Sequence, residues 1–420
     1  MTRTKRIVVT LCSIAAAAMT ACAFAACDDD EQEHQLTHHA AVAPTCTEAG
    51  SVEYWSCSDC DKLFADEDAS EEITDVTIPA TGHNWEDAEV VKVATYTQAG
   101  SKKQVCTECE EEQTVTLEAL EYTADATVEA GESISAAIEA AQDGDVIVVK
   151  AGTYAEQLFI QDKDITIIGE GEVIVSGPAN YDDLQSVAKI AGESMDYTAL
   201  VAVVNGDVTI ENITVRGDIE AARASLKVTH NTRYLGVAAI NASLTLNYVD
   251  VEDIRFTEDY LGMQNGIGVY GVATDAQKEV VMRYSSVTNF NKGAIVMRAS
   301  VANFVCDGCT IAGVGEQAIT AQNGIQVACA ATITNNTVKD MKYSADNEWA
   351  HGSVGIYVLT EEADSVTVTG NTLANVDNGI YGYVNGAVAN SETAKEDNTF
   401  TDLYEEGYDF YETPAAADAE

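Results

Sequence analysis

The sequence predicts an all-β protein whose main body, residues 122–410, is a right-handed parallel β-helix. Short apolar strands separated by polar turns recur along this region, and their last apolar residues fall at positions 215, 251, 287, 311, 338, 373 and 400. Strands this short cannot bury a face alone, so successive coils must stack equivalent residues on one another, as in a solenoid. A single helix at the start of this body, and two small Cys-x-x-Cys β modules before it, complete the prediction.

The first 27 residues have the three parts of an export signal. A positively charged start precedes an apolar, alanine-rich stretch from Ile7 to Ala26. The segment Phe24-Ala25-Ala26-Cys27, followed by aspartates, resembles a bacterial lipobox, which implies lipidation of Cys27; Cys22 is a second candidate. We therefore expect an extracytoplasmic protein that is either a membrane-anchored lipoprotein or, if the signal is simply cleaved, secreted.

Residues 28–33 read as a short acidic tether, and an internal repeat follows in residues 34–82 and 83–120. The first copy reads Thr45-Cys46-Thr47-Glu48-Ala49-Gly50-Ser51 and then Cys57-Ser58-Asp59-Cys60; the second reads Thr95-Tyr96-Thr97-Gln98-Ala99-Gly100-Ser101 and then Cys106-Thr107-Glu108-Cys109. This pattern resembles a small Cys-x-x-Cys repeat of bacterial surface proteins. The second copy departs from it at Tyr96, where the pattern has Cys.

The cysteines and histidines of the repeats predict a structural staple, because small modules lack a large core. In the first copy, Cys46, Cys57 and Cys60 with His34 (or His38 or His39) suit tetrahedral zinc. A disulfide from Cys46 to Cys57 or Cys60 is an equal alternative outside the cell. The second copy offers only His83, Cys106 and Cys109, which weakens the case for zinc there and favours a disulfide-like closure or an unoccupied site. One site shared between the copies is a further alternative.

The solenoid is expected to begin with a helix over residues 133–141, whose apolar residues have helical spacing behind Ser133 as the N-cap. This helix would cover the open first end of the sheets. Residues 177–198 read as an insertion. In the later coils a second motif, Gly followed by alternating apolar residues, alternates with these strands. We call it the Gly-apolar phrase. Asn at the turns is expected to tolerate the left-handed conformation and to form ladders with Asn of adjacent coils. Cys306, Cys309 and Cys329 fall inside this pattern, as a disulfide or as small buried residues.

The stretch from residue 131 to 169, with "GDVIVVKAGTY" and "DITIIG", resembles the opening of the pectinesterase and pectate-lyase-like superfamily. The resemblance covers residues 122–405 and implies the pectin-lyase fold. The motif Gly152–Glu156 matches the first motif of pectin methylesterases, which is mainly structural in that family. The catalytic motifs of pectinesterases, pectate lyases and polygalacturonases were not found, so whether the protein is an enzyme stays open.

Polar residues of the Gly-apolar phrases, flanked by aromatic side chains, predict a face that binds neutral sugars. The residues are Gln264, Asn265, Lys292, Gln322, Asn323, Trp349, His351, Asp377, Asn378 and Tyr381. Ordinary Asn-Gly turns and surface tyrosines are the competing interpretation.

The net charge of −47 disfavours nucleic acid and unaided binding of anionic polysaccharides, and keeps a surface protein soluble. The resulting hypothesis is a cell-surface lipoprotein whose β-helix binds a carbohydrate or surface polymer. The alternatives are a polysaccharide-active enzyme (lyase, esterase or glycoside hydrolase) and an adhesin-like structural stalk.

Overall fold

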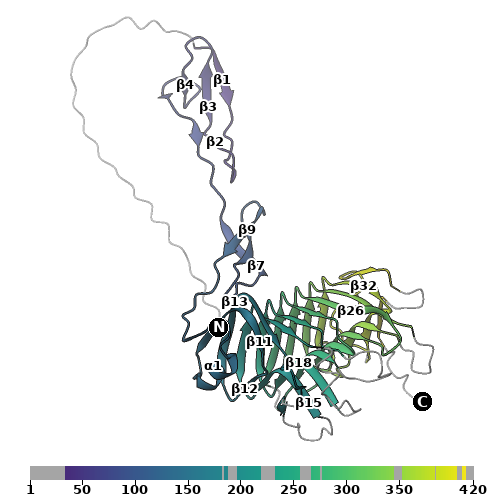
Figure 1. Cartoon of the computed structure of the whole chain (residues 1–420). Coiled ribbons are helices and arrows are strands. Elements are labelled where there is room, and N and C mark those ends of the chain that lie inside the picture. Colours follow the sequence, from purple (N-terminus) through teal and green to yellow (C-terminus); the bar gives the residue numbers. More distant parts are fainter. Residues whose placement is uncertain are drawn as a thin grey trace, which may run out of the picture. The chain divides into compact units, whose positions relative to one another are not determined.

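The structure, a computed structural model, describes residues 34–181, 184–187, 196–218, 232–255, 266–274, 277–344, 352–383, 385–403 and 409–412. It divides the chain into two compact units (Figure 1). The first unit runs to Ala88 and includes Gln104–Gln113; the second is Glu89–Lys103 together with the chain from Thr114 onward. Within the described residues no helix is long and apolar enough to span a bilayer. The predicted signal and Cys27 lie outside the described residues.

The second unit is a right-handed parallel β-helix, as predicted. Its 16-stranded sheet contains β10 (Ala126–Val128), β11 (Val146–Ala155), β13 (Asp164–Ser176), β16 (Asp207–Glu211), β17 (Thr214–Arg216), β19 (Ser243–Asn247), β20 (Asp250–Glu252), β22 (Glu279–Arg283), β23 (Ser286–Thr288), β25 (Asn303–Asp307), β26 (Thr310–Gln317), β28 (Ala331–Thr334), β29 (Thr337–Tyr343), β31 (Val366–Thr369), β32 (Thr372–Val376) and β34 (Thr399–Thr401). Its 10-stranded sheet contains β12 (Leu158–Gln161), β14 (Ser186–Val187), β15 (Asp196–Val204), β18 (Thr232–Ile240), β21 (Ile267–Val272), β24 (Gly293–Met297), β27 (Asn323–Val327), β30 (Val354–Val358), β33 (Asn378–Gly382) and β35 (Phe410–Glu412).

Each coil contributes three strands, because the larger sheet has two arms that meet at β13. The first half of this long strand pairs with β16 and its last three residues pair with β17. From there each arm continues through every third strand, and the 10-stranded sheet takes the remaining one. Figure 1 shows these strands stacked along one axis, so the core is a column between three faces.

The predicted column of inward side chains is confirmed. Val215, Val251, Val287, Ile311, Val338, Leu373 and Phe400 are successive register partners along one arm. A second column, on the 10-stranded sheet, contains Ile295, Ile325, Ile356 and Ile380. There Val269 precedes Ile295, whereas Ile267 pairs with Gly293. Each column removes branched apolar side chains from water, and their burial stabilises the coil stack.

The turns use Asn in the two ways that the sequence predicts. Asn205, Asn212 and Asn241 have positive φ angles, a conformation that Asn adopts more easily than most residues. Buried side chains of Asn336, Asn371 and Asn398 form a ladder in which each amide nitrogen donates to the next carbonyl oxygen at 2.9 Å. These bonds satisfy buried polar groups and fix the register of the last coils.

The solenoid begins with α1 (Ile134–Ala140), and the predicted cap is confirmed, since Ala136 N donates to Ser133 Oγ. Ile134 and Ile138 are buried against the first coil. The carboxylate of Glu156 accepts hydrogen bonds from the backbone N–H groups of Ile134 and Ser135 at 2.8 and 3.2 Å. This part of the esterase-like motif Gly152–Glu156 therefore holds the capping helix on the solenoid.

The first unit contains two small sheets. One is antiparallel, in the order β1 (Leu36–His39), β3 (Tyr54–Cys57), β4 (Leu63–Phe64) and β5 (Glu72–Ile73); the other pairs β2 (Gly50–Ser51) with β6 (Thr77–Ile78). A three-stranded sheet follows in the chain, in the order β7 (Trp85–Lys92), β8 (Gly100–Cys106) and β9 (Glu112–Leu117). Apart from its cysteines, only Phe64 of the first unit is a fully buried hydrophobic residue among the described ones. So small a core needs a further source of stability.

Candidate metal centre and binding face

Each repeat builds a triad of one histidine and two cysteines in the same way. In the first, the register of β1 with β3 pairs Leu36 with Cys57, which brings His34 beside Cys57. The backbone N–H of Cys57 donates to Lys62 O at 2.9 Å, and that of Cys106 donates to Glu111 O at 2.8 Å. Both turns therefore place the two cysteine side chains of Cys-x-x-Cys on the same side as the histidine.

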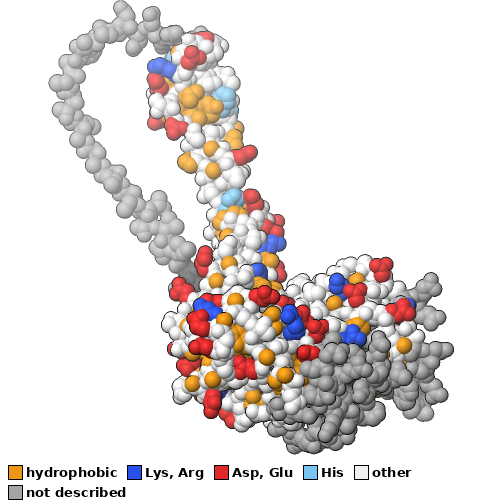
Figure 2. Space-filling view, viewed as in Figure 1, with side chains coloured by type: hydrophobic (Ala, Val, Ile, Leu, Met, Phe, Trp, Pro, Cys, Tyr) orange, Lys and Arg blue, Asp and Glu red, His pale blue; other side chains and the backbone are white. Residues whose placement is uncertain are grey.

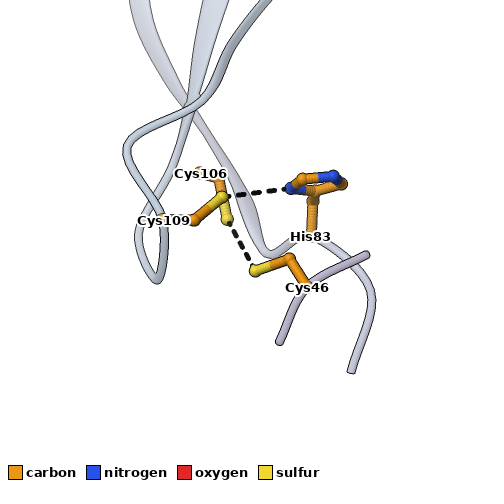
Figure 3. A group of neighbouring side chains, drawn as sticks. All are labelled: Cys46, His83, Cys106 and Cys109. Carbon is orange, nitrogen blue, oxygen red and sulfur yellow. Dashed lines mark hydrogen bonds between the residues drawn. The ribbon is translucent and has the colours of Figure 1, made fainter. Parts of the chain in front are cut away.

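Cys46 joins the triad of the second repeat (Figure 3). Its Sγ lies 3.8 Å from Cys106 Sγ, and Cys109 Sγ lies 3.4 Å from His83 Nδ1. All four ligand atoms lie within 4.8 Å of one another. Zn–S bonds of about 2.3 Å and a Zn–N bond of about 2.0 Å in a tetrahedron require S···S and S···N separations of about 3.8 and 3.6 Å. The four side chains therefore fit a Cys₃His zinc site, and together they would supply all four ligands.

The position of Cys46 follows from its loop, Thr45–Gly50, which we call the donor loop. Thr45 O and Cys46 O accept hydrogen bonds from the backbone N–H groups of Thr81 and Gly82, which directly precede His83. The loop is tightly built, because a Cβ on Gly50 would lie 2.2 Å from Val42 O. The first repeat therefore carries its triad at one end and its donor loop at the other, next to the following repeat.

The electrostatic surroundings of the four-residue site are those of crowded thiols. Burial, and then the neighbouring Cys109 and Cys106, raise the pKa of Cys46 to about 11. Burial also raises the pKa of Cys106, but hydrogen bonds from the backbone N–H groups of Glu108 and Cys109 and from His83 outweigh this and lower it to about 6. A divalent cation would stabilise thiolates at both positions.

The first repeat has a triad without a fourth ligand among the described residues. His34 Nδ1 lies 3.4 Å from Cys57 Sγ and 3.6 Å from Cys60 Sγ. The contact with Cys60 and, against the effect of burial, that with His34 lower the pKa of Cys57 to about 7. The ring of His34 packs on Phe64, with centroids 5.2 Å apart. His38 and His39 point elsewhere, to Glu53 and Ser56.

Two sequence predictions are corrected by this arrangement. Cys46 is not a ligand partner of His34, Cys57 and Cys60, because its loop lies at the other end of the first repeat. The second repeat is not limited to three candidate ligands, because Cys46 lies within 4.8 Å of them, which is the grouping that the shared-site alternative expects. All described cysteines are free thiols, including Cys306, Cys309 and Cys329, which are buried in the solenoid core.

Most of the described residues that were predicted to form a sugar-binding face lie inside the corners of the coils. Gln322 is fully buried and donates to Phe290 O, while Asp377 accepts from the backbone N–H groups of Tyr343 and Ser353. Asn323 and Asn378 are each at least nine-tenths buried. Their polar atoms join one coil to the next, so they do not offer a surface to a glycan. Gln264, Asn265, Trp349 and His351 lie outside the described residues.

Lys292 occupies the same corner. Its Nζ donates to Ala321 O at 2.6 Å, and burial lowers its pKa to about 8. Burial also raises the pKa of Asp377, against the opposing effect of the backbone N–H groups that it accepts from. Both groups are thus engaged in coil-to-coil contacts rather than in a groove.

Tyr381, in contrast, lies on the outer face of the 10-stranded sheet. It is the middle of a ladder with Tyr357 and Tyr411, its register partners on β30 and β35. The ring centroids are 5.3 Å apart for Tyr357 and Tyr381 and 5.2 Å for Tyr381 and Tyr411. All three are partly exposed, and Gln326 precedes them in the same column. We call these four residues the tyrosine ladder.

The same outer column is closed at the earlier coils. There Ala202, Ala238 and Tyr270 occupy the equivalent positions and are buried in a second apolar cluster. The sequence pattern singled out Tyr381 but not its partners. The signal was available, because each ladder residue directly follows an inward residue of the second column, as in Ile325-Gln326, Ile356-Tyr357 and Ile380-Tyr381.

No protein-family profile matches the chain, and no curated protein is similar to it. Solved structures are similar at low identity. The pectin methylesterase PemA from Erwinia chrysanthemi is 16% identical, over 71% of this chain and 92% of that chain, with a TM-score of 0.40. The family 28 exopolygalacturonase from Yersinia enterocolitica is 11% identical, over 91% of this chain and 100% of that chain, with a TM-score of 0.27.

These similarities concern the fold alone. They bring no catalytic residue to this chain, and its own strand register establishes the solenoid independently.

Proposed function

We propose that the protein is a lipid-anchored cell-surface protein whose β-helix binds a neutral polysaccharide along the tyrosine ladder. In this proposal Cys27 carries the lipid, residues 28–33 form the tether, and residues 34–82 and 83–120 are spacer modules stapled by zinc. The repeats hold the solenoid, residues 122–410, away from the membrane, and the solenoid carries the binding face.

The tyrosine ladder is the observation that carries the proposal. Three partly exposed rings at the coil repeat form a continuous aromatic row, in which Tyr357 lies edge-on to Tyr381 and Tyr381 stacks on Tyr411. Gln326 adds an amide in line with them, and Tyr383 is 54% exposed beside the same strand end. Flat aromatic surfaces combined with a few polar groups suit sugar rings, which have apolar faces and polar edges.

The charge of the protein favours a neutral rather than an anionic glycan. The net charge is −47, and acidic side chains are scattered over the solenoid face seen in Figure 2. A polyuronate would meet repulsion from this surface unless a cation bridged the two. Binding to neutral glycans should therefore change little with ionic strength.

The test is direct binding to a panel of neutral and anionic polysaccharides, with wild-type protein and Tyr381→Ala. Loss of the central ring should weaken binding to the recognised neutral glycan by about tenfold or more, as for a central aromatic contact. Tyr54→Ala is the matched control, because Tyr54 is also partly exposed but stacks on His39 in the first unit.

Equal binding by wild-type protein and Tyr381→Ala would refute the ladder as the binding face. Absence of binding to every glycan would favour a purely structural stalk. Release of reducing ends or unsaturated products from the same panel would favour the enzymatic alternative.

A further inference from the structure

The two repeats assemble metal ligands across copies, and this leaves one ligand set incomplete. The donor loop of the first repeat supplies Cys46 to the triad of the second. The triad of the first repeat, His34, Cys57 and Cys60, has no fourth ligand among the described residues, and residues 1–33 hold no copy of the donor-loop sequence. We propose that this triad binds a divalent metal ion with its fourth position open, and that the open position takes a thiolate from outside the chain.

The geometry of the triad supports metal binding. Its two N···S separations of 3.4 and 3.6 Å match the separation in the second site, 3.4 Å between Cys109 Sγ and His83 Nδ1. The equivalent backbone bonds recur too, since Ser58 N donates to Gln35 O at 3.1 Å and Thr107 N to Asn84 O at 3.0 Å. The first triad therefore has the same backbone support as the second.

The surroundings of the triad support an accessible fourth position. Cys57 is buried, whereas His34 and Cys60 are partly exposed. In the second site the corresponding space is filled by Cys46, which is buried. Three protein ligands with one exchangeable position is the arrangement that lets zinc accept an external ligand, whereas four protein ligands close the site.

The chemistry of the missing ligand follows from the second site. There the fourth donor is a cysteine sulfur, on a loop brought by the neighbouring repeat. A thiolate completing the first triad would reproduce that Cys₃His set, which binds zinc more strongly than a set containing water. The expected external ligand is therefore a small thiol.

The experiment uses the whole chain, reduced and metal-free, titrated with Co²⁺ and followed by its visible and near-ultraviolet absorption. Two Co²⁺ ions should bind, the second on the order of 100-fold more weakly, because it has three protein ligands rather than four. Adding 2-mercaptoethanol should raise the sulfur-to-cobalt absorption of the weaker site by about half, since its cobalt–sulfur bonds rise from two to three. The stronger site should not respond.

Variants assign the two responses. The double variant Cys57→Ser, Cys60→Ser should bind one Co²⁺, whose absorption does not change when 2-mercaptoethanol is added. Cys106→Ser, Cys109→Ser should keep only the responsive ion. Cys46→Ala is the matched test, because it opens the second site and should make it respond to thiol as the first does.

The spectrum of the intact second site reports that the first unit is folded in Cys57→Ser, Cys60→Ser. Binding of a single Co²⁺ by wild-type protein would overturn the proposal. So would a weaker site whose spectrum is the same with and without the thiol. Neither outcome bears on glycan binding, which the proposed function concerns.

Discussion

The two copies of the repeat have the same loop backbone but contact different neighbours through it. Thr45 N donates to Glu48 O, and Thr95 N donates to Gln98 O, each at 2.9 Å. Gly50 and Gly100 are both buried, and a Cβ on either would lie within 2.5 Å of a backbone carbonyl oxygen, that of Val42 or that of Lys92. The loop is therefore a fixed scaffold on which one residue can change.

The residue that differs between the two copies decides whether the loop supplies a metal ligand or a docking contact. In the first copy Cys46 reaches the triad of the next repeat. In the second copy the position is Tyr96, and the loop docks on the solenoid instead, where the buried carboxylate of Glu211 accepts from the backbone N–H groups of Tyr96 and Thr97 at 3.2 and 2.5 Å. The Tyr96 ring meets Tyr122 edge-on, with centroids 5.9 Å apart.

The comparison teaches that the loop is a connector whose chemistry follows the body that comes next. Where a triad follows, the loop supplies sulfur. Where the β-helix follows, the backbone N–H groups of Tyr96 and Thr97 and the Thr97 hydroxyl donate hydrogen bonds to the Glu211 carboxylate. Val93 N, which donates to Tyr284 Oη at 2.9 Å, and Lys92, whose Nζ lies over the Tyr248 ring, extend the second contact.

Metal removal should break the first connector most strongly. A strong chelator under reducing conditions should speed hydrogen exchange throughout the described part of the first unit. The reason is that the buried hydrophobic residues described there are only Phe64 and three cysteines. The inner strands of the solenoid, such as β22 and β25, should keep their protection. Hydrogen exchange with mass spectrometry measures both, and chelator already saturated with zinc is the control. Unchanged exchange in Leu36–His39 and Tyr54–Cys57 would contradict a stapling metal.

Glu211→Ala should break the second connector alone. The substitution leaves two backbone N–H groups and the Thr97 hydroxyl without their acceptor, so the local opening free energy of the loop should fall by about 2–3 kcal/mol. This fall would appear as faster hydrogen exchange of the Thr97 amide and faster proteolysis between Thr95 and Gly100 than in the wild-type protein. Asp207→Ala, an exposed carboxylate on the same strand, is the control. Wild-type protection of Thr97 in Glu211→Ala would mean that the carboxylate does not hold the loop.

Tyr96→Cys should have the smallest effect, and it sharpens the comparison. The described residues near this loop offer no His-Cys-x-x-Cys triad, so a cysteine here should bind no additional zinc. Metal content per chain, measured by elemental analysis, should equal that of the wild type. An additional zinc ion would show that the loop cysteine alone specifies a site.

The solenoid was predictable because inward positions are read directly from residue identity. The last apolar residue of each recurring strand faces the core. The sequence alone therefore aligns the seven residues from Val215 to Phe400 in one column. The Asn-Gly corners were misassigned as surface for a related reason. Stacked coils bury their own corners, and the burial of Gln322 and Asp377 depends on a neighbouring coil that local pattern does not reveal.

The metal ligands were predictable by type but not by grouping. Spacing within the chain grouped Cys46 with Cys57, because the local sequence does not indicate at which end of a repeat the donor loop lies. One signal did bear on it: the copy that is followed by no further triad is the copy that lacks the cysteine, with Tyr96 in its place. The offset arrangement of loop and triad explains both facts.

That offset has a consequence for how such a chain can change in length. Duplicating the whole first repeat, whose loop carries Cys46, preserves the existing pairing of loop and triad and creates one more, so the spacer can grow in full steps. An insertion or deletion between Cys46 and His83 would instead change the spacing of the loop cysteine and the histidine that form one site. Selection should therefore tolerate variation in the number of copies far better than variation in the length of a single copy.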